Sequence, residues 1–171
     1  SYHGQIVVMT QPHIGNYGVQ PEDFEWHRPA VAGFCVQDLT VVPRHFSSRQ
    51  SVGELLARAG IPGIAGVPVR ELTLRVRAAG ALRGLITSRR ESVAAWQRKL
   101  RRSPKMRGRA LAAEVSASKP YVWEQDAWEG GHRLAVLDFG VKRSLLREFR
   151  KAGCSVKVFP AHTPAGELLA G

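Results

Sequence analysis

Short apolar runs, rich in β-branched residues, alternate with amphipathic stretches along most of this 171-residue chain. The apolar runs predict a buried strand at residues 6–10, one or two strands within 31–42, and further strands at 61–67 and 82–87. Between the first two lies a stretch rich in Gly, Pro and Asn, residues 11–18, which predicts a loop.

Three amphipathic stretches predict helices. The first, residues 51–59, starts with the capping-box pair Ser51 and Glu54 and ends at Gly60. The second starts at Pro68, because a proline costs little in a first helical turn, and ends at Gly80. The third covers residues 91–102. In the second helix the expected buried stripe is Leu72, Val76 and Ala79. In the third helix it is Val93, Trp96 and Leu100.

The pattern changes near residue 132. Residues 134–137 form a continuous apolar run, typical of a strand covered on both faces, and residues 156–159 predict a second strand. Between them an amphipathic helix is expected, with its stripe at Val141, Leu145, Leu146 and Phe149. This β-α-β order predicts a parallel pair of strands. A further helix is expected to start at Thr163 and Pro164.

The domain organisation follows from these patterns. Residues 119–131 are irregular, and Gly130-Gly131 indicates a linker between a first domain, 1–131, and a second, 132–171. Two strands and one helix cannot bury enough surface to make a stable domain alone. We therefore expect an α/β protein with a β-rich first domain and a second domain of which the sequence holds only the start.

Composition favours a globular protein, with 44% hydrophobic and 23% charged residues. No apolar run is long enough for a membrane span, and the first residues lack the features of a secretion signal. Cys35 and Cys154 stand too far apart to predict a disulfide framework or a zinc site. The expected location is the cytoplasm.

Charge is concentrated in one stretch, residues 89–109, which we call the basic segment. It carries +8 of the formal net charge of +11. A solvated helix face and a protein-binding surface both fit this pattern. Nucleic-acid binding is not favoured, because no nucleic-acid fold signature accompanies the charge and Trp96 lies at core spacing. Its members are Arg89, Arg90, Arg98, Lys99, Arg101, Arg102, Lys105, Arg107 and Arg109, with Glu91 as the one acid.

Motifs for catalysis are incomplete. There is no nucleophile elbow, and both cysteines are expected to be structural. The six histidines show no metal-ligand spacing, and His13 is expected to be a loop residue bonded to the backbone, although a loop histidine can also be functional. Residues 140–144 follow a strand and open a helix, but they lack the glycines of a phosphate loop, which favours an ordinary strand-to-helix turn.

Three motifs nevertheless resemble the small, glutamine-hydrolysing subunit of carbamoyl-phosphate synthase. They are SYHGQIV with TQPHIGNYG at residues 1–18, RELT with Arg77, Gly80 and Gly84, and DFGVKRSLLR at residues 138–147. The resemblance covers the whole chain in the same order. It implies an N-terminal domain of the swivelling β/β/α type, followed by the first β-α-β of a parallel-sheet class I glutamine amidotransferase domain that is cut off.

The resemblance also implies a mechanism. The family hydrolyses L-glutamine with a Cys-His-Glu triad, whose place in the family pattern lies after residue 171, so this chain alone is expected to be inactive. Ammonia passes to a large subunit, which uses ATP and Mg²⁺ to make carbamoyl phosphate for arginine and pyrimidine synthesis. Of the family's functional residues, only the glutamine-binding serine is matched, by Ser1. No cofactor is expected on this chain.

One departure from the family pattern is clear. Pro68 and Val69 stand where the family has Asp-Thr, which predicts the loss of a side-chain cap at the start of the second helix. The alternative function is therefore a catalytically inactive remnant that binds an acidic partner through the basic segment.

Overall fold

The computed structural model describes residues 2–124 and 131–170. It shows a mixed α/β protein with parallel sheets, as expected. The contacts divide it into two compact units: an N-terminal unit of Tyr2–Asp23 and Arg28–Arg109, and a C-terminal unit of Phe24–His27 and the described residues after Arg109. The assignment of domains to 1–131 and 132–171 stays a prediction.

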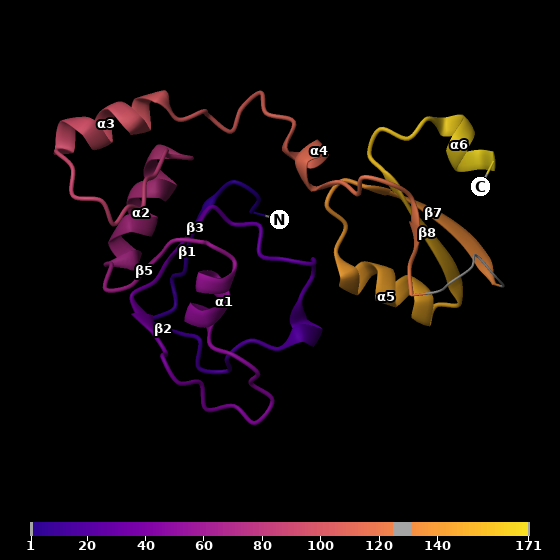
Figure 1. The fold of residues 1–171 in the computed structure, drawn as a ribbon, viewed down its shortest axis with the longest axis horizontal. Helices are drawn as coiled ribbons and strands as arrows, with labels where there is room; N and C mark the ends of the chain where they lie inside the picture. The colour runs from indigo at the N-terminus through magenta and orange to yellow at the C-terminus, as the bar shows by residue number, and fades with distance from the viewer. Residues whose placement is uncertain (1, 125–130, 171) are drawn as a thin grey trace. The chain divides into compact units, whose positions relative to one another are not determined.

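Very short strands build the N-terminal unit (Figure 1). β1 (Ile6–Val8), β3 (Gly33–Cys35) and β5 (Gly63–Ile64) form one parallel sheet in the order β1-β3-β5. β2 (His13–Ile14) pairs in parallel with β4 (Asp38–Leu39). The 3₁₀ turn η1 covers Pro21–Asp23. The strands predicted near residues 6–10, 31–42 and 61–67 are confirmed, while β2 lies inside the predicted loop.

The strand predicted at residues 82–87 is wrong, since these residues form no strand. Ile86 instead places its side chain over the sheet: a Cβ added at Gly33 would lie 2.9 Å from Ile86 Cδ1. Gly84 similarly approaches Ile6, whose Cδ1 would lie 3.0 Å from an added Cβ. The segment therefore packs against β1 and β3 through the Ile86 side chain and the Gly84 backbone rather than joining their hydrogen-bond ladder.

Helix ends in this unit follow local chemistry. α1 (Val52–Arg58) has the predicted capping box, in which Ser51 Oγ accepts from Glu54 N at 3.1 Å and Glu54 Oε2 accepts from Ser51 N at 2.7 Å. α2 (Val69–Ala79) follows Pro68 with no side-chain cap, as the family departure predicted. Val69 is only 1% exposed, so the first residue of α2 belongs to the core.

The predicted stripes of these helices need two corrections. Ala79, the last residue of α2, is exposed, and the buried stripe instead runs from Val69 through Leu72 to Val76. α3 (Val93–Arg102) starts after Ser92, whose side chain accepts from Ala95 N. Val93 is 63% exposed, because it stands in the uncovered first turn of that helix.

The C-terminal unit contains the predicted β-α-β. β7 (His132–Asp138) pairs in parallel with β8 (Cys154–Pro160), and α5 (Arg143–Lys151) connects them and lies beside them in Figure 1. β6 (Tyr121–Val122) adds an antiparallel edge, giving the order β6-β8-β7. α4 (Leu111–Val115) and α6 (Ala165–Ala170) complete the unit.

Its core is Leu146, Val156 and Val158, with partly buried apolar side chains packed around them. Leu145 is 47% exposed, so its place in the predicted stripe is wrong: it lies about 100° round the helix from Leu146. β7 is less covered than its apolar run predicted, since Ala135 is exposed. β6 falls in the stretch expected to be irregular, and the linker residue Gly130 lies outside the described residues.

No helix in the described part of the chain is long and apolar enough to span a membrane.

Candidate functional site

A buried carboxylate organises the turn from β7 into α5. Asp138 ends β7 and is 4% exposed. Its Oδ1 accepts from the amides of Gly140 and Val141, each at 2.8 Å, and its Oδ2 accepts from Ala117 N at 2.8 Å. Gly140 has φ +93°, and a Cβ there would meet Val115 Cγ2 at 3.0 Å. Asp138 therefore joins the turn to the segment that follows α4.

Glu25 caps the start of α5 from a distant part of the chain. Its backbone oxygen accepts from Arg143 N at 3.1 Å, and its Oε2 accepts from Ser144 N at 2.8 Å. The hydrogen bonds from Ser144 lower the pKa of Glu25, and the charges of Arg147 and Lys142 lower it further. These contacts hold residues 24–27 on the C-terminal unit.

Together Asp138 and Glu25 decide between the phosphate-loop and strand-to-helix-turn interpretations of residues 140–144. The amides of Gly140, Val141, Arg143 and Ser144 all donate to Asp138 or Glu25. A phosphate group needs those donors vacant. The interpretation as an ordinary strand-to-helix turn is confirmed.

A cavity of about 310 Å³ lies beside this turn, within the C-terminal unit. Its wall includes the aromatic side chains of Trp26, Tyr121 and Trp123, while Asp138 and Arg143 supply charge. Burial raises the pKa of Tyr121, the nearby Asp138 charge raises it further, and Arg143 opposes both. Its lining holds no thiol among the described residues, and Asp138 already accepts three hydrogen bonds. The described lining residues could bind a ligand or simply pack together, and none of them is an activated nucleophile.

Both cysteines lie in structural settings. Cys35 is 4% exposed on β3, and burial raises the pKa of its thiol, which disfavours the nucleophilic thiolate. Cys154 packs against the core cluster of the C-terminal unit. The expectation that both are structural agrees with these positions.

The histidine singled out by sequence stands elsewhere than expected. His13 is in β2 rather than a loop, opposite Asp38 of β4. Its Nδ1 lies 4.0 Å from Asp38 Oδ2, and both side chains are more than half exposed. The expected bond to backbone is wrong, because strand pairing brings the carboxylate alongside the ring. Among the described residues, no three His, Cys, Asp or Glu side chains group as metal ligands would.

The structure does not describe the residue that was predicted to bind glutamine. Ser1, expected to bind glutamine, lies outside the described residues, and its role stays a prediction. Sequence reasoning in turn missed Glu25. Its partner Ser144 is 119 positions away, so no local spacing could signal the contact.

Comparison with known proteins gives the same family along the whole chain. Residues 1–86 match the family model described as the carbamoyl-phosphate synthase small chain, CPSase domain. Proteins named carbamoyl phosphate synthase small chain are 37% identical in Syntrophotalea carbinolica, 38% in Thermosynechococcus vestitus and 40% in a Nostoc species. Each alignment covers 99% of this chain, and the chain spans about half of each relative, 47–48%. On the family match and these identities, the chain belongs to the carbamoyl-phosphate synthase small-chain family.

Proposed function

We propose that this chain acts as part of the small, glutaminase subunit of a glutamine-dependent carbamoyl-phosphate synthase. The observation that carries the proposal is the family likeness over 99% of the chain. The β7-α5-β8 unit supports the finer architecture, an N-terminal domain of the swivelling type followed by the start of a class I amidotransferase domain. In this role the chain is a scaffold, and Ser1 contributes to the binding of L-glutamine.

The chemistry is divided between chains in this proposal. Glutamine hydrolysis needs a thiolate nucleophile, and neither Cys35 in its buried strand nor Cys154 against the core is placed as one. Ammonia serves a large subunit, which uses ATP and Mg²⁺ to make carbamoyl phosphate for arginine and pyrimidine synthesis in the cytoplasm. This chain binds neither cofactor.

Co-purification with the large subunit tests the proposal. The polypeptide that carries this sequence would be co-expressed with the large subunit of the same organism and recovered through a tag on the large subunit. We expect recovery in a one-to-one ratio that survives gel filtration. Loss of the chain from the complex at both low and physiological salt would contradict the proposal.

A second function rests on the basic segment, as a binding module for an acidic partner independent of the synthase. The observation that favours it is the excess of exposed cations there over the acids that the structure describes. Retention of the chain by acidic proteins together with failure to bind the large subunit would support this second function.

A further inference from the structure

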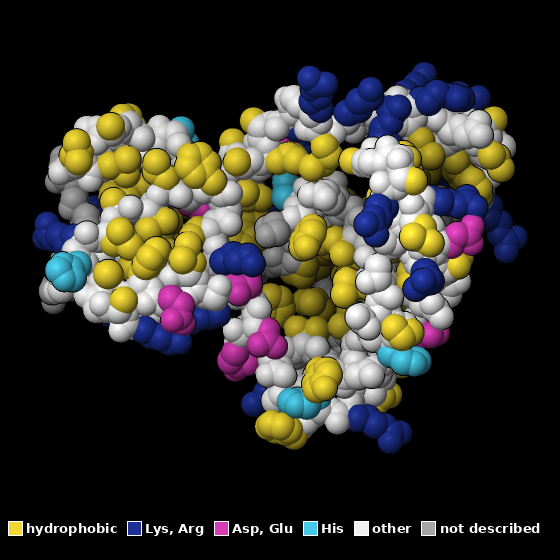
Figure 2. All heavy atoms as spheres, turned by 180° about the vertical axis from the view of Figure 1, so that it is seen from behind, with side chains coloured by type: hydrophobic (Ala, Val, Ile, Leu, Met, Phe, Trp, Pro, Cys, Tyr) yellow, Lys and Arg dark blue, Asp and Glu magenta, His cyan; other side chains and the backbone are white. Residues whose placement is uncertain are grey.

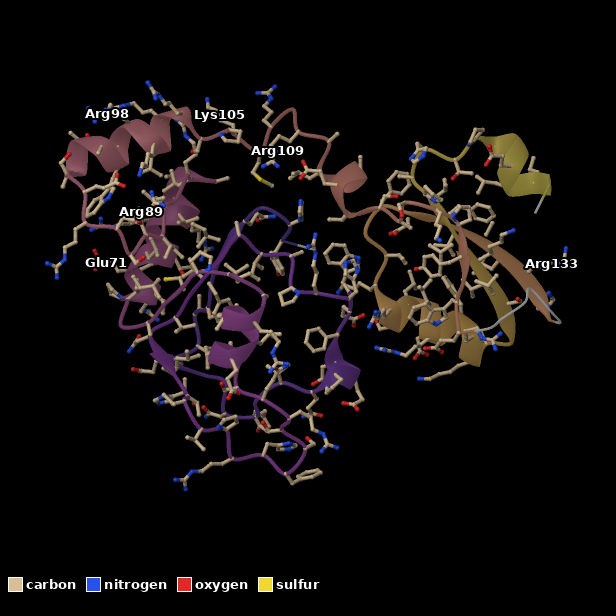
Figure 3. The ribbon with its side chains drawn as sticks, in the orientation of Figure 1. Glu71, Arg89, Arg98, Lys105, Arg109 and Arg133 are labelled. Carbon is tan, nitrogen blue, oxygen red and sulfur yellow. The ribbon has the colours of Figure 1, made fainter. Side chains whose placement is uncertain are left out.

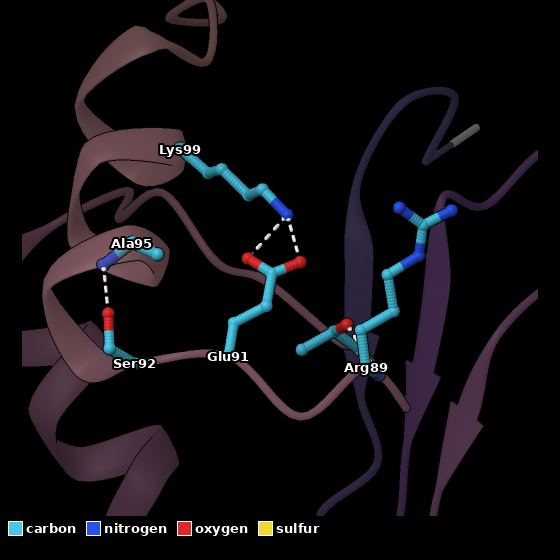
Figure 4. A network of polar contacts seen from close by, with 6 residues as sticks. Arg89, Glu91, Ser92, Ala95 and Lys99 are labelled. Atoms are coloured by element: carbon cyan, nitrogen blue, oxygen red, sulfur yellow. Dashed lines mark hydrogen bonds and ion pairs between the residues drawn. The ribbon is translucent and has the colours of Figure 1, made fainter.

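The basic segment holds its charges on an ordered scaffold. α3 is capped at its start by Ser92, whose Oγ accepts from Ala95 N at 3.2 Å (Figure 4). Its end is held by Arg83, whose Nη1 donates to the carbonyl oxygens of Arg101 and Ser103 at 2.8 and 3.2 Å. Both ends of α3 are therefore held by hydrogen bonds, and the backbone that carries its arginine side chains is ordered.

The helix is two-sided. Trp96 and Leu100 are half-buried and share one face, and the indole Nε1 of Trp96 is fully shielded. Arg98, Arg101 and Arg102, spaced at i, i+3 and i+4, lie on the opposite face and are exposed. We call these three residues the arginine face. Figure 3 shows Arg98 and, from the following loop, Lys105 pointing outward.

Ion pairs within the described part of the chain do not neutralise the positive charge of the arginine face. Glu91, the one acid of the segment, is bound by Lys99, whose Nζ lies 2.6 and 2.7 Å from its two oxygens (Figure 4). The structure shows no ion pair between the arginine face and the acidic groups that it describes. Figure 2 shows Lys and Arg side chains gathered along the edge that holds α3 and the loop after it. Such a surface attracts an acidic partner and accelerates its association.

The chemistry of the face favours a protein over a nucleic acid. Guanidinium groups bind carboxylates in a two-pronged geometry, which suits an acidic protein surface. Single-stranded nucleic acids are held largely by stacking on exposed aromatic rings. The aromatic residue of the segment, Trp96, turns its shielded face inward and offers no such platform.

We propose that the arginine face, Arg98, Arg101 and Arg102, docks on an acidic surface of the synthase large subunit and steers the assembly of the two chains. This inference rests on the proposed function and deepens it by naming the surface. It assigns to α3 a role in partner recognition that is separate from the carboxylate-organised turn at Asp138.

Binding kinetics against the immobilised large subunit test the proposal. The polypeptide that carries this sequence would be compared with the variant R98Q/R101Q/R102Q. The control R44Q/R49Q/R58Q removes the same charge from exposed positions outside the basic segment. Glutamine favours helix, so the variants keep α3 and α1 intact, and circular dichroism checks this. Salt is varied from about 50 to about 300 mM, the range over which exposed charges become screened.

We expect the association rate of R98Q/R101Q/R102Q to fall roughly ten-fold at low salt and its salt dependence to flatten, with the control changing less than about three-fold. Equal rates for the variant and the control would overturn the docking surface while leaving the proposed function standing. No binding by the unmodified chain at any salt would instead refute the proposed function, and this inference with it.

A duplex DNA probe of about 20 base pairs is measured beside the large subunit, since phosphate contacts would show the same salt dependence. We expect weak binding that physiological salt abolishes. Tight duplex binding that depends on the arginine face, with unchanged large-subunit binding, would overturn the proposal in favour of a nucleic-acid surface.

Discussion

Two carboxylates do most of the positioning at the turn between β7 and α5. Asp138 satisfies three backbone amides from inside the protein, and Glu25 satisfies the first amides of α5. Buried amides left without acceptors are costly, so both residues stabilise the local backbone by hydrogen bonding. The DFG motif that helped to place the chain in its family thus has a structural role here, in shaping a turn.

Replacement of Asp138 tests this role. Asp138→Asn keeps one oxygen acceptor but turns an NH₂ group toward a donor, so we expect a loss of roughly 1.5–3 kcal/mol in the free energy of unfolding. Asp138→Ala, which leaves all three amides without their acceptor, should cost more. Chemical denaturation followed by circular dichroism measures both. An alanine variant as stable as the parent would show that these bonds contribute nothing.

Glu25 gives a pH-dependent prediction. Its pKa is lowered in the folded state, so its contribution is present above the ordinary glutamate pKa and is lost as pH falls through the lowered value. Glu25→Gln should therefore lower the melting temperature near neutral pH, and the gap to the parent should close in acid. The control Glu22→Gln removes an exposed charge three residues earlier. A gap that stays constant with pH would contradict the charge-based cap.

Individual elements follow local sequence wherever capping or periodicity is strong. The Ser51–Glu54 box starts α1 where it was predicted, and Ser92 starts α3. The error at Leu145 is instructive, since Leu145 and Leu146 are equally apolar and both fit a wide helical stripe. Leu146 is the one buried, because it packs against β8. A single sequence does not show on which side of the helix the sheet lies.

Matched alanine variants of the two leucines test that choice. Leu146→Ala removes a side chain that is 1% exposed, and we expect a loss of about 2–5 kcal/mol in unfolding free energy. Leu145→Ala removes the same atoms from a half-exposed position and should cost less than about 1 kcal/mol. Urea denaturation at constant pH measures the difference. Equal losses would mean that the helix is rotated from its described orientation.

The whole molecule forms two compact units, and their membership is not contiguous in sequence. Residues 24–27 leave the N-terminal unit and join the C-terminal one through Glu25. The family likeness covers both units, and the proposed role in the synthase is therefore a property of the whole chain.

At this scale we predict that the purified chain releases no ammonia from glutamine, because Cys35 is buried with a raised thiol pKa and Cys154 packs against the core. A coupled glutamate dehydrogenase assay measures the release. The variants Cys35→Ser and Cys154→Ser serve as controls for any background signal. Ammonia release that disappears in one of them would identify that cysteine as a nucleophile.

The sequence by itself determined much of this protein. The family motifs, the capping box that starts α1, the parallel β7-α5-β8 unit and the concentration of charge in the basic segment were all predictable, because each depends on local spacing or on composition. The tertiary structure decided the rest: the packing of residues 82–87, the buried side of α5, and the capping of that helix by Glu25. These depend on contacts between residues far apart in the chain, which the periodicity of a single sequence does not encode.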